Sequence, residues 1–320
     1  METVILMIDV FLLSISIILF LINYQKVNSI GQIERELGLR SHKAKNHTPT
    51  LGGIAILIST ILFFTISAIL NELDIKIYLL LIIPLLGYGI LGFIDDWLIL
   101  TKGKNDGISA GLKFFIQIVI AAIYFMIYLG YQFDTSIDLI FLKIDLKFLY
   151  GIFLLLAFSG FSNATNLTDG IDGLLGTSFI LVLLSYALLS NQLIIQQFIA
   201  IMISAIMGFL VFNLPKAKIF MGNTSALAFG AVMVSIAVII KFEISIFIFG
   251  FLYLLEVMSV MMQVSYYKLT KGKRIFKMAP LHHHFEIIYN SETKALKLMI
   301  LIQILSCIFG LIIFKIFIVK

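Results

Sequence analysis

The sequence predicts an all-α polytopic membrane protein, and three observations carry this prediction. Of the 320 residues, 61% are hydrophobic and only 13% are charged, which is about half the charged fraction of a soluble domain. Apolar runs of roughly 17–25 residues, long enough to span a bilayer as helices, recur from one end of the chain to the other. These runs lack the alternation of apolar and polar residues that is typical of a membrane β-barrel.

We expect about ten transmembrane helices in one membrane domain that covers residues 1–320. The predicted spans cover residues 3–23, 51–70, 76–93, 114–131, 148–165, 174–190, 194–212, 225–241, 244–266 and 296–317. No internal repeat and no low-complexity linker divides the chain. The single cysteine, Cys307, lies in the last span, so the sequence contains neither a disulfide framework nor a cysteine-based metal site.

The distribution of basic residues predicts which side of the membrane each loop faces. Five loops on one side, with their immediate flanks, hold 17 of the 23 Lys and Arg residues. These loops cover residues 24–50, 94–113, 166–173, 213–224 and 267–295. Because basic loops stay in the cytoplasm, we expect all five to face it. On the opposite side only the connection at about 132–147 is long, and its alternating residues from Ile137 to Leu149 indicate a small hairpin.

The first two cytoplasmic loops contain candidate phosphate-binding and metal-binding residues. Lys45 lies just before a turn that Pro49 and the pair Gly52–Gly53 predict, and it is a candidate phosphate contact. Asp95 and Asp96 directly follow the third span. Adjacent side chains on a helix point about 100° apart, so we expect these carboxylates to serve different partners. One suits Mg²⁺, which takes one or two carboxylates plus water and phosphate oxygens, and the other a phosphate or a proton.

The third loop and the end of the span before it carry a carboxamide or a carboxylate at every third position, namely Asn163, Asn166, Asp169 and Asp172. At that spacing the four groups line one strip of a helix or of a 3₁₀ turn. Donors and acceptors together suit a polar ligand such as a nucleotide or a sugar. An EF-hand is a poor fit, because its ligands recur at every second position and a Glu closes the loop.

The fourth and fifth loops add groups for a planar ring and for phosphate. The fourth loop contains Phe220, which can stack on a ring, and small polar residues that open the eighth span. The fifth loop places His282, His283 and His284 beside a cluster of Lys and Arg. Consecutive histidines cannot all face one metal ion in regular geometry. Imidazoles and neighbouring cations together suit phosphate groups better.

Taken together, these residues predict phosphoryl transfer between a nucleotide-linked donor and a lipid acceptor. Carboxylates suit Mg²⁺, cations suit phosphate, and the Asn and Asp side chains suit a polar headgroup. Phosphoryl transfer depends mainly on positioning and on charge neutralisation, which these residue types provide. The net charge of +5 gives no reason to expect nucleic acid as a partner.

The motifs in these loops also resemble those of the phospho-N-acetylmuramoyl-pentapeptide-transferases, in that family's order and spacing from about Gln32 to Lys294. The matching segments are residues 48–53, 92–96, 163–173, 220–222 and 278–286, together with Glu256, Ser259, Val260 and Gln263. The run of three histidines is the specific motif. Related polyprenyl-phosphate N-acetylhexosamine-1-phosphate transferases share the aspartate motifs but lack this form of it.

The resemblance implies a reaction, a location and a role for each matching residue. UDP-N-acetylmuramoyl-pentapeptide and undecaprenyl phosphate would give UMP and the first lipid-linked peptidoglycan precursor, with Mg²⁺, at the cytoplasmic face of a bacterial plasma membrane, in a homodimer. Asp95, Asp96 and Asp169 would be catalytic, and Asp96 and Asn223 would ligate the metal. The implied substrate-binding residues are Lys45, Asn166, Asp172, Asn213, Phe220, His282, His283 and His284, with Asp172 and Phe220 at the uracil.

Asn223 departs from the family's pattern, in which an aspartate at this place binds Mg²⁺. An amide oxygen can ligate Mg²⁺ but carries no charge, so we expect a weaker ion affinity, with a higher Mg²⁺ requirement or low activity. Pro215–Lys216 also replaces the family's Asn-Pro and places an additional cation nearby.

Three other functions compete with this interpretation. A relative that uses another UDP-sugar is disfavoured by the histidine run. A low-activity or regulatory paralogue is suggested by Asn223 but disfavoured by the retention of the four aspartates at 95, 96, 169 and 172. A channel or transporter needs polar groups deep within its spans, whereas here they gather at the cytoplasmic ends.

Overall fold

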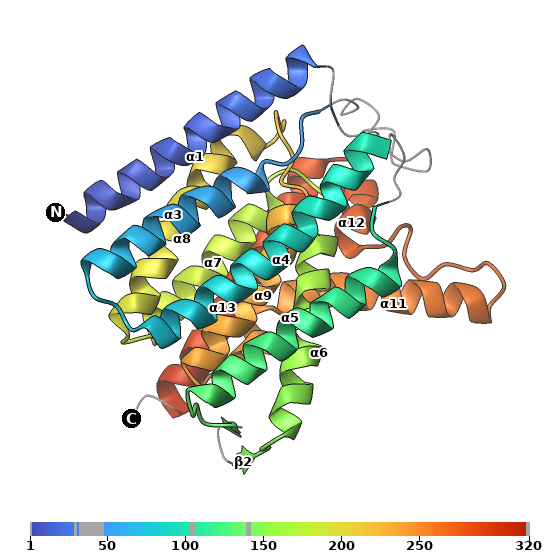
Figure 1. The fold of residues 1–320 in the computed structure, drawn as a ribbon. Helices are drawn as coiled ribbons and strands as arrows, with labels where there is room; N and C mark the ends of the chain where they lie inside the picture. Colours follow the sequence, from blue (N-terminus) through green and yellow to red (C-terminus); the bar gives the residue numbers. More distant parts are fainter. Residues whose placement is uncertain (1, 29–30, 32–47, 103–106, 139–141, 318–320) are drawn as a thin grey trace.

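The computed structural model of the protein describes residues 2–28, 31, 48–102, 107–138 and 142–317. These residues form a bundle of helices with a two-stranded hairpin at one end (Figure 1). In chain order the elements are α1 (Glu2–Val27), α3 (Gly53–Leu70), α4 (Ile75–Lys102), α5 (Ala110–Gly130), β1 (Ser136–Asp138), β2 (Lys143–Asp145), α6 (Leu149–Thr168), α7 (Leu174–Leu189), α8 (Leu193–Asn213), α9 (Asn223–Ile239), α10 (Ser245–Phe249), α11 (Phe251–Leu269), α12 (Leu281–Tyr289) and α13 (Glu292–Phe317). The predicted all-α class is confirmed.

Six of the described helices are long and apolar enough to cross a bilayer: α1, α3, α4, α5, α8 and α13. The apolar helices α7 and α9 are shorter. The chain is therefore a multi-pass membrane protein, and the number of ten spans stays a prediction. The predicted span 244–266 is not one continuous helix, because α10 and α11 meet at Gly250. A Cβ at Gly250 would lie 2.4 Å from the Ile246 carbonyl oxygen and 2.7 Å from the Phe161 ring.

Helix α9 forms the centre of the bundle, with α4 and α6 packed against it. Every residue from Thr224 to Ile239 is buried. Two glycines permit the close approach of these helices. A Cβ at Gly92 of α4 would lie 2.2 Å from the Asn223 carbonyl oxygen, and one at Gly230 of α9 would lie 2.2 Å from the Phe161 carbonyl oxygen of α6. Small residues at such contacts are typical of packed membrane helices.

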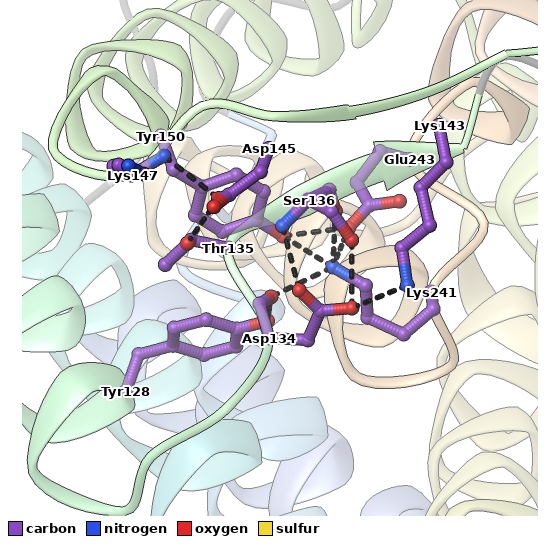
Figure 2. Close-up of polar contacts among 10 residues, drawn as sticks. All are labelled: Tyr128, Asp134, Thr135, Ser136, Lys143, Asp145, Lys147, Tyr150, Lys241 and Glu243. Carbon is purple, nitrogen blue, oxygen red and sulfur yellow. Dashed lines mark hydrogen bonds and ion pairs between the residues drawn. The ribbon is translucent and has the colours of Figure 1, made fainter.

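The predicted hairpin is present, and a partly buried ion pair holds it against the bundle (Figure 2). Strands β1 and β2 are antiparallel, with Ile137 opposite Ile144. Lys241, in the turn after α9, donates from Nζ to the Ser136 carbonyl oxygen at 2.7 Å and to Glu243 Oε1 at 2.6 Å. Tyr150 donates to the same Glu243 oxygen at 2.6 Å. The hairpin and α12 lie at opposite ends of the bundle (Figure 1).

Candidate active site

The paired carboxylates lie inside α4, which continues to Lys102 through the first part of the predicted loop 94–113. Each has partners of its own, but both contact Asn223. Asp95 Oδ2 accepts hydrogen bonds from Lys113 Nζ and from Asn223 Nδ2, both at 2.6 Å. Asp95 Oδ1 accepts the main-chain N–H of Ile108 at 2.7 Å. The Asp95 side chain is 3% exposed and that of Lys113 is 19% exposed. Asp95 is therefore a buried anion whose charge the Lys113 ammonium compensates.

The neighbouring carboxylate, Asp96, caps the N-terminus of α9 from another helix. Its Oδ1 accepts the main-chain N–H of Asn223 at 3.0 Å. Its Oδ2 accepts the main-chain N–H of Thr224 at 3.0 Å and the Thr224 hydroxyl at 2.9 Å. Gly222 precedes the helix with a φ of 78°, and a Cβ there would lie 2.5 Å from Asp96 Oδ2. An anion is favourable at this position because the first amides of a helix lack intrahelical partners.

The third loop is shorter than the predicted 166–173, because α6 continues to Thr168. Asp169 follows the last residue of α6, and Gly173, with a φ of 78°, precedes α7. Desolvation raises the pKa of the Asp169 carboxyl well above its ordinary value, and the carboxylates of Asp96 and Asp172 raise it further. Three acidic groups therefore share one electrostatic neighbourhood at the end of the bundle.

The four Asn and Asp residues of this segment do not form the single ligand strip that their spacing predicts. Asn163 donates from Nδ2 to Gln117 Oε1 of α5 at 3.1 Å, inside the bundle. Asp172 is 3% exposed, and its Oδ2 accepts the main-chain N–H of Ala217 at 2.9 Å. The Asp172 main-chain N–H in turn donates to Glu292 Oε1 at 2.8 Å. Asn166 lies on the last turn of α6 and is partly exposed.

The fourth loop is fixed on both sides by hydrogen bonds. Asn213 accepts the Gly173 N–H at 3.0 Å and donates to the Ile219 carbonyl oxygen at 2.9 Å. Phe220 donates its main-chain N–H to the Pro49 carbonyl oxygen at 2.8 Å and accepts the Gly52 N–H at 2.9 Å. The segment that the Pro and Gly residues predict as a turn is thus paired with the Phe220 segment. Lys45 lies outside the described residues.

The three consecutive histidines have three different environments. His282 is 1% exposed, and its Nδ1 lies 3.1 Å from Glu256 Oε2. His283 Nδ1 lies 3.4 Å from Glu286 Oε2. His284 Nδ1 accepts the main-chain N–H of Lys277 at 3.1 Å. Desolvation and then the charge of Lys277 lower the pKa of His284, which keeps this ring neutral and able to accept that bond.

The sequence does not identify the partners of three contributors to this site, although Lys113 and the small polar residues that open α9 are candidates to meet an anion. Lys113 has no motif around it, and only the structure pairs it with Asp95. Thr224 binds Asp96 through the local geometry of a helix start, which a Gly followed by small polar residues signals weakly. Glu256 belongs to the quoted pattern, but its contact with His282 joins residues that lie far apart in the sequence.

The donor set at Asp96 and Asn223 fits a Mg²⁺ ion, although with less charge than a carboxylate pair would supply. Within the described part of the chain, no group of three or more His, Cys, Asp and Glu side chains is placed to hold a metal. Asp96 Oδ1 accepts one protein hydrogen bond and keeps a lone pair. Asn223 turns Nδ2 toward Asp95, which leaves its Oδ1 for a cation. One carboxylate is sufficient for Mg²⁺ when water and phosphate oxygens complete the octahedron.

The chain is similar to known transferases over most of its length. The family model described as Glycosyl transferase family 4 matches residues 77–241, about half of the chain. A phospho-N-acetylmuramoyl-pentapeptide-transferase of Staphylococcus carnosus is 39% identical over 309 residues, which cover 94% of this chain and 96% of the relative. The protein of the same name from Staphylococcus epidermidis is 41% identical, covering 94% of this chain and 95% of the relative. That of Staphylococcus saprophyticus is 42% identical, covering 88% and 89%.

Proposed function

Because the chain belongs to the phospho-N-acetylmuramoyl-pentapeptide-transferases, within glycosyl transferase family 4, we propose that it transfers phospho-N-acetylmuramoyl-pentapeptide from its UDP donor to undecaprenyl phosphate. The products are UMP and lipid I. The observation that carries the proposal is the meeting of Asp95, Asp96, Asp169 and Asn223 at one end of a membrane bundle. In this proposal the water-soluble donor and the membrane-bound acceptor meet at these groups.

The proposed reaction is a displacement at phosphorus. An oxygen of the acceptor phosphate forms a bond to the β-phosphorus of the donor, and the bond from that phosphorus to the bridging oxygen breaks. UMP leaves with the electron pair. Both reactants are anions, so the site has to compensate charge as they approach. The Lys113 ammonium, bonded to Asp95 Oδ2, is the described cation nearest to the carboxylates, and it is positioned to attract the acceptor phosphate.

We assign the three catalytic aspartates separate tasks on this basis. Asp95 orients Lys113, because the two side chains form a buried pair. Asp96 holds the start of α9, and with it Asn223, in place. Asp169, whose pKa is raised, is the group that exchanges a proton with a phosphate oxygen.

The proposed metal is Mg²⁺, held by Asp96 and by Asn223 through Oδ1. When bound, Mg²⁺ neutralises charge on the diphosphate and polarises its β-phosphorus. An amide ligand brings no charge, so we propose that this chain needs more Mg²⁺ than a protein with aspartate at that position. The alternative is that asparagine in place of aspartate at position 223 abolishes turnover, which would make the chain a low-activity or regulatory paralogue.

The remaining predicted residues are proposed to bind the donor. Asp172 and Phe220 take the uracil, and the others contact its sugar and phosphates: Lys45, Asn166, Asn213, His282, His283 and His284. For Lys45 the support is the resemblance of its motif alone, because it lies outside the described residues. For the others it is also their position in or next to the short segments that join the helices.

We further propose that this end faces the cytoplasm of a bacterium, in a plasma-membrane protein with ten spans that forms a homodimer. The excess of Lys and Arg on the loops of that side supports the orientation. The resemblance of the motifs supports the spans and the dimer.

The proposal is tested by UMP release from the purified protein in detergent with Mg²⁺. We expect release to require both the UDP-linked muramoyl-pentapeptide and undecaprenyl phosphate, and Asp95→Asn to lower the rate by about 100-fold or more. UDP-N-acetylglucosamine in place of the muramoyl donor decides between this function and that of a transferase for another UDP-sugar. Faster turnover of UDP-N-acetylglucosamine would contradict the proposed donor.

A further inference from the structure

A buried carboxylate–imidazole pair lies directly behind the third loop, and the reaction proposed above leaves its carboxylate without a task. Glu256 is on α11 and His282 opens α12. Their side chains are 0% and 1% exposed. The imidazole lies between Glu256 on one side and Gly170 of the third loop on the other.

The Glu256 side of the pair fixes which nitrogen of the ring carries a proton. Glu256 Oε2 lies 3.1 Å from His282 Nδ1 and 3.4 Å from the His282 main-chain nitrogen, which donates to it. Glu256 Oε1 and His282 Nδ1 have no hydrogen-bond partner of regular geometry among the described residues, so the 3.1 Å approach of Nδ1 to Oε2 is a close polar contact. A buried carboxylate is stabilised by nearby donors. A proton on Nδ1 would add a second donor to the main-chain N–H, whereas a lone pair on Nδ1 would repel the carboxylate.

The opposite edge of the ring faces the candidate site. A Cβ added at Gly170 would lie 2.0 Å from His282 Nε2 and 2.6 Å from its Cε1. Nε2 therefore lies against the backbone of the residue that follows Asp169. Nε2 is buried and has no hydrogen-bond partner among the described residues. A buried nitrogen without a partner is costly in a folded protein and calls for one.

From these contacts we propose that Glu256 is a positioning residue for the transferase reaction, acting through His282. Its carboxylate holds the proton on Nδ1 and fixes the plane of the ring, so that Nε2 is presented beside Asp169 to a polar group of the UDP-linked donor. A carboxylate behind an imidazole orients the ring and selects its tautomer in the same way in other sites. Gly170 is part of the arrangement, because any larger residue there would displace the ring. The inference rests on the proposed function.

The test is a double-mutant cycle with kcat/KM for the donor as the readout. Glu256→Gln keeps the shape of the side chain but removes its charge, and we expect a loss of about 10- to 100-fold. The same change in a His282→Asn background should cost nothing further, because Glu256 acts only through the ring. Ser265→Ala, at an exposed position near the far end of α11 and outside the matching motifs, is the control. It should stay within about twofold of the wild type.

A second readout does not depend on turnover. In protein labelled with ¹⁵N-histidine, the His282 signals are those that disappear in His282→Asn. At pH 8 we expect the Nδ1–H tautomer in the wild type and a shift toward Nε2–H, the common form of free imidazole, in Glu256→Gln. Identical His282 signals in the wild type and Glu256→Gln, or losses that multiply in the double mutant, would overturn the inference. A wild type that releases no UMP would contradict the proposed function instead, and the tautomer of His282 would still decide the role of Glu256.

Discussion

Asn223 is the residue through which the two carboxylates of α4 are joined. Its side chain donates to Asp95 at 2.6 Å, and its main-chain N–H donates to Asp96 at 3.0 Å. An aspartate at the same place would bring a carboxylate oxygen against Asp95 Oδ2, where like charges repel. The amide replaces that repulsion with a hydrogen bond. Asn223 thus links Asp95 and Asp96 by hydrogen bonds. The site has one negative charge fewer with which to bind a cation than it would have with aspartate at this position.

The first prediction concerns this residue. Asn223→Asp should shift the Mg²⁺ dependence of UMP release to lower concentration by about tenfold, which corresponds to about 1.4 kcal/mol of ion binding. Without Mg²⁺ the same variant should melt at a lower temperature, because Asp95 loses a donor and gains a like charge. Asn71→Asp, in the turn after α3, adds the same charge away from the site and is the control. Identical Mg²⁺ titrations of the wild type and Asn223→Asp would contradict the prediction.

The second prediction concerns the protonation of Asp169, whose pKa is raised by desolvation and by Asp96 and Asp172. A carboxyl with a raised pKa in the folded state favours folding below its unfolded pKa, and this contribution is lost as the pH rises through the folded pKa. Asp169→Asn removes this loss of stability at high pH, because an amide does not ionise. Without Mg²⁺ it should therefore raise the melting temperature at pH 8 and have little effect at pH 3, while UMP release falls about 100-fold. If Asp169→Asn raised the melting temperature more at pH 3 than at pH 8, the expected direction of the pH dependence would be refuted.

At the residue scale, the sequence predicts the chemical role of a side chain better than it predicts which other side chains it contacts. The angle between successive helical residues predicts different partners for Asp95 and Asp96. The structure bears this out for Lys113 and Thr224 but not for Asn223, which contacts both carboxylates. The pairing of Asp95 with Lys113 does not follow, because it depends on how α5 is placed beside α4. The hydrogen bond from Asn163 to Gln117 likewise depends on how α6 packs against α5.

At the scale of elements, the hairpin is an example of a local pattern that a distant residue stabilises. The alternation of residues predicts the strands, and their register is that of a simple antiparallel pair. Lys241, however, reaches the hairpin from the turn after α9 and brings the buried Glu243 with it (Figure 2). Nothing in the hairpin's own sequence indicates this anchor.

The third prediction tests that anchor. Lys241→Met leaves Glu243, which is 1% exposed, with Tyr150 as its donor. Because Lys241 is itself 30% exposed, we expect a loss of about 1–3 kcal/mol in the free energy of unfolding. Turnover should stay within about twofold, since the hairpin lies at the other end of the bundle from α12.

The matched control for this prediction is Lys143→Met. Lys143 forms its ion pair with Asp134 on the exposed side of the same hairpin, at 2.9 Å. Its removal should change the melting temperature little, because solvent screens such pairs. A destabilisation by Lys143→Met equal to that by Lys241→Met would contradict the anchor.

Helix boundaries show why elements are only partly predictable. Hydrophobic runs predict the α-helical class and most of the helices, because length and apolar character are local properties. The division of the predicted span 244–266 into α10 and α11 is not visible in hydropathy, since it arises where Gly250 meets Phe161 of α6. The helix α12 inside the fifth loop is not predicted by hydropathy either, because it is short and polar.

At the scale of the whole molecule, the bundle separates a structural end from a chemical end. The hairpin and its ion pair lie at one end, and α12 with its histidines lies at the other (Figure 1). The loops predicted to be cytoplasmic carry all the candidate site residues. The sequence can predict this division because the distribution of basic residues and the spacing of spans are properties of the entire chain.

The fourth prediction gives the orientation in the membrane. In a Cys307→Ser background, which removes the only cysteine, two exposed lysines are replaced singly: Lys143→Cys in the hairpin and Lys273→Cys between α11 and α12. A membrane-impermeant maleimide should label the first in intact spheroplasts and the second only after permeabilisation. The reverse pattern would place the candidate site outside the cell and contradict the proposed orientation.

The central claim, that the chain transfers the sugar together with the β-phosphate of the donor, is tested most directly by following that phosphate. With UDP-N-acetylmuramoyl-pentapeptide labelled at that phosphorus, undecaprenyl phosphate and Mg²⁺, the label should move into the lipid product while an equal amount of unlabelled UMP is released. Labelled UDP as the soluble product would mean that the sugar alone is transferred. Label that stays in the donor while Asp95, Asp96 and Asp169 are intact would mean that the site at the end of α4 does not carry out phosphoryl transfer.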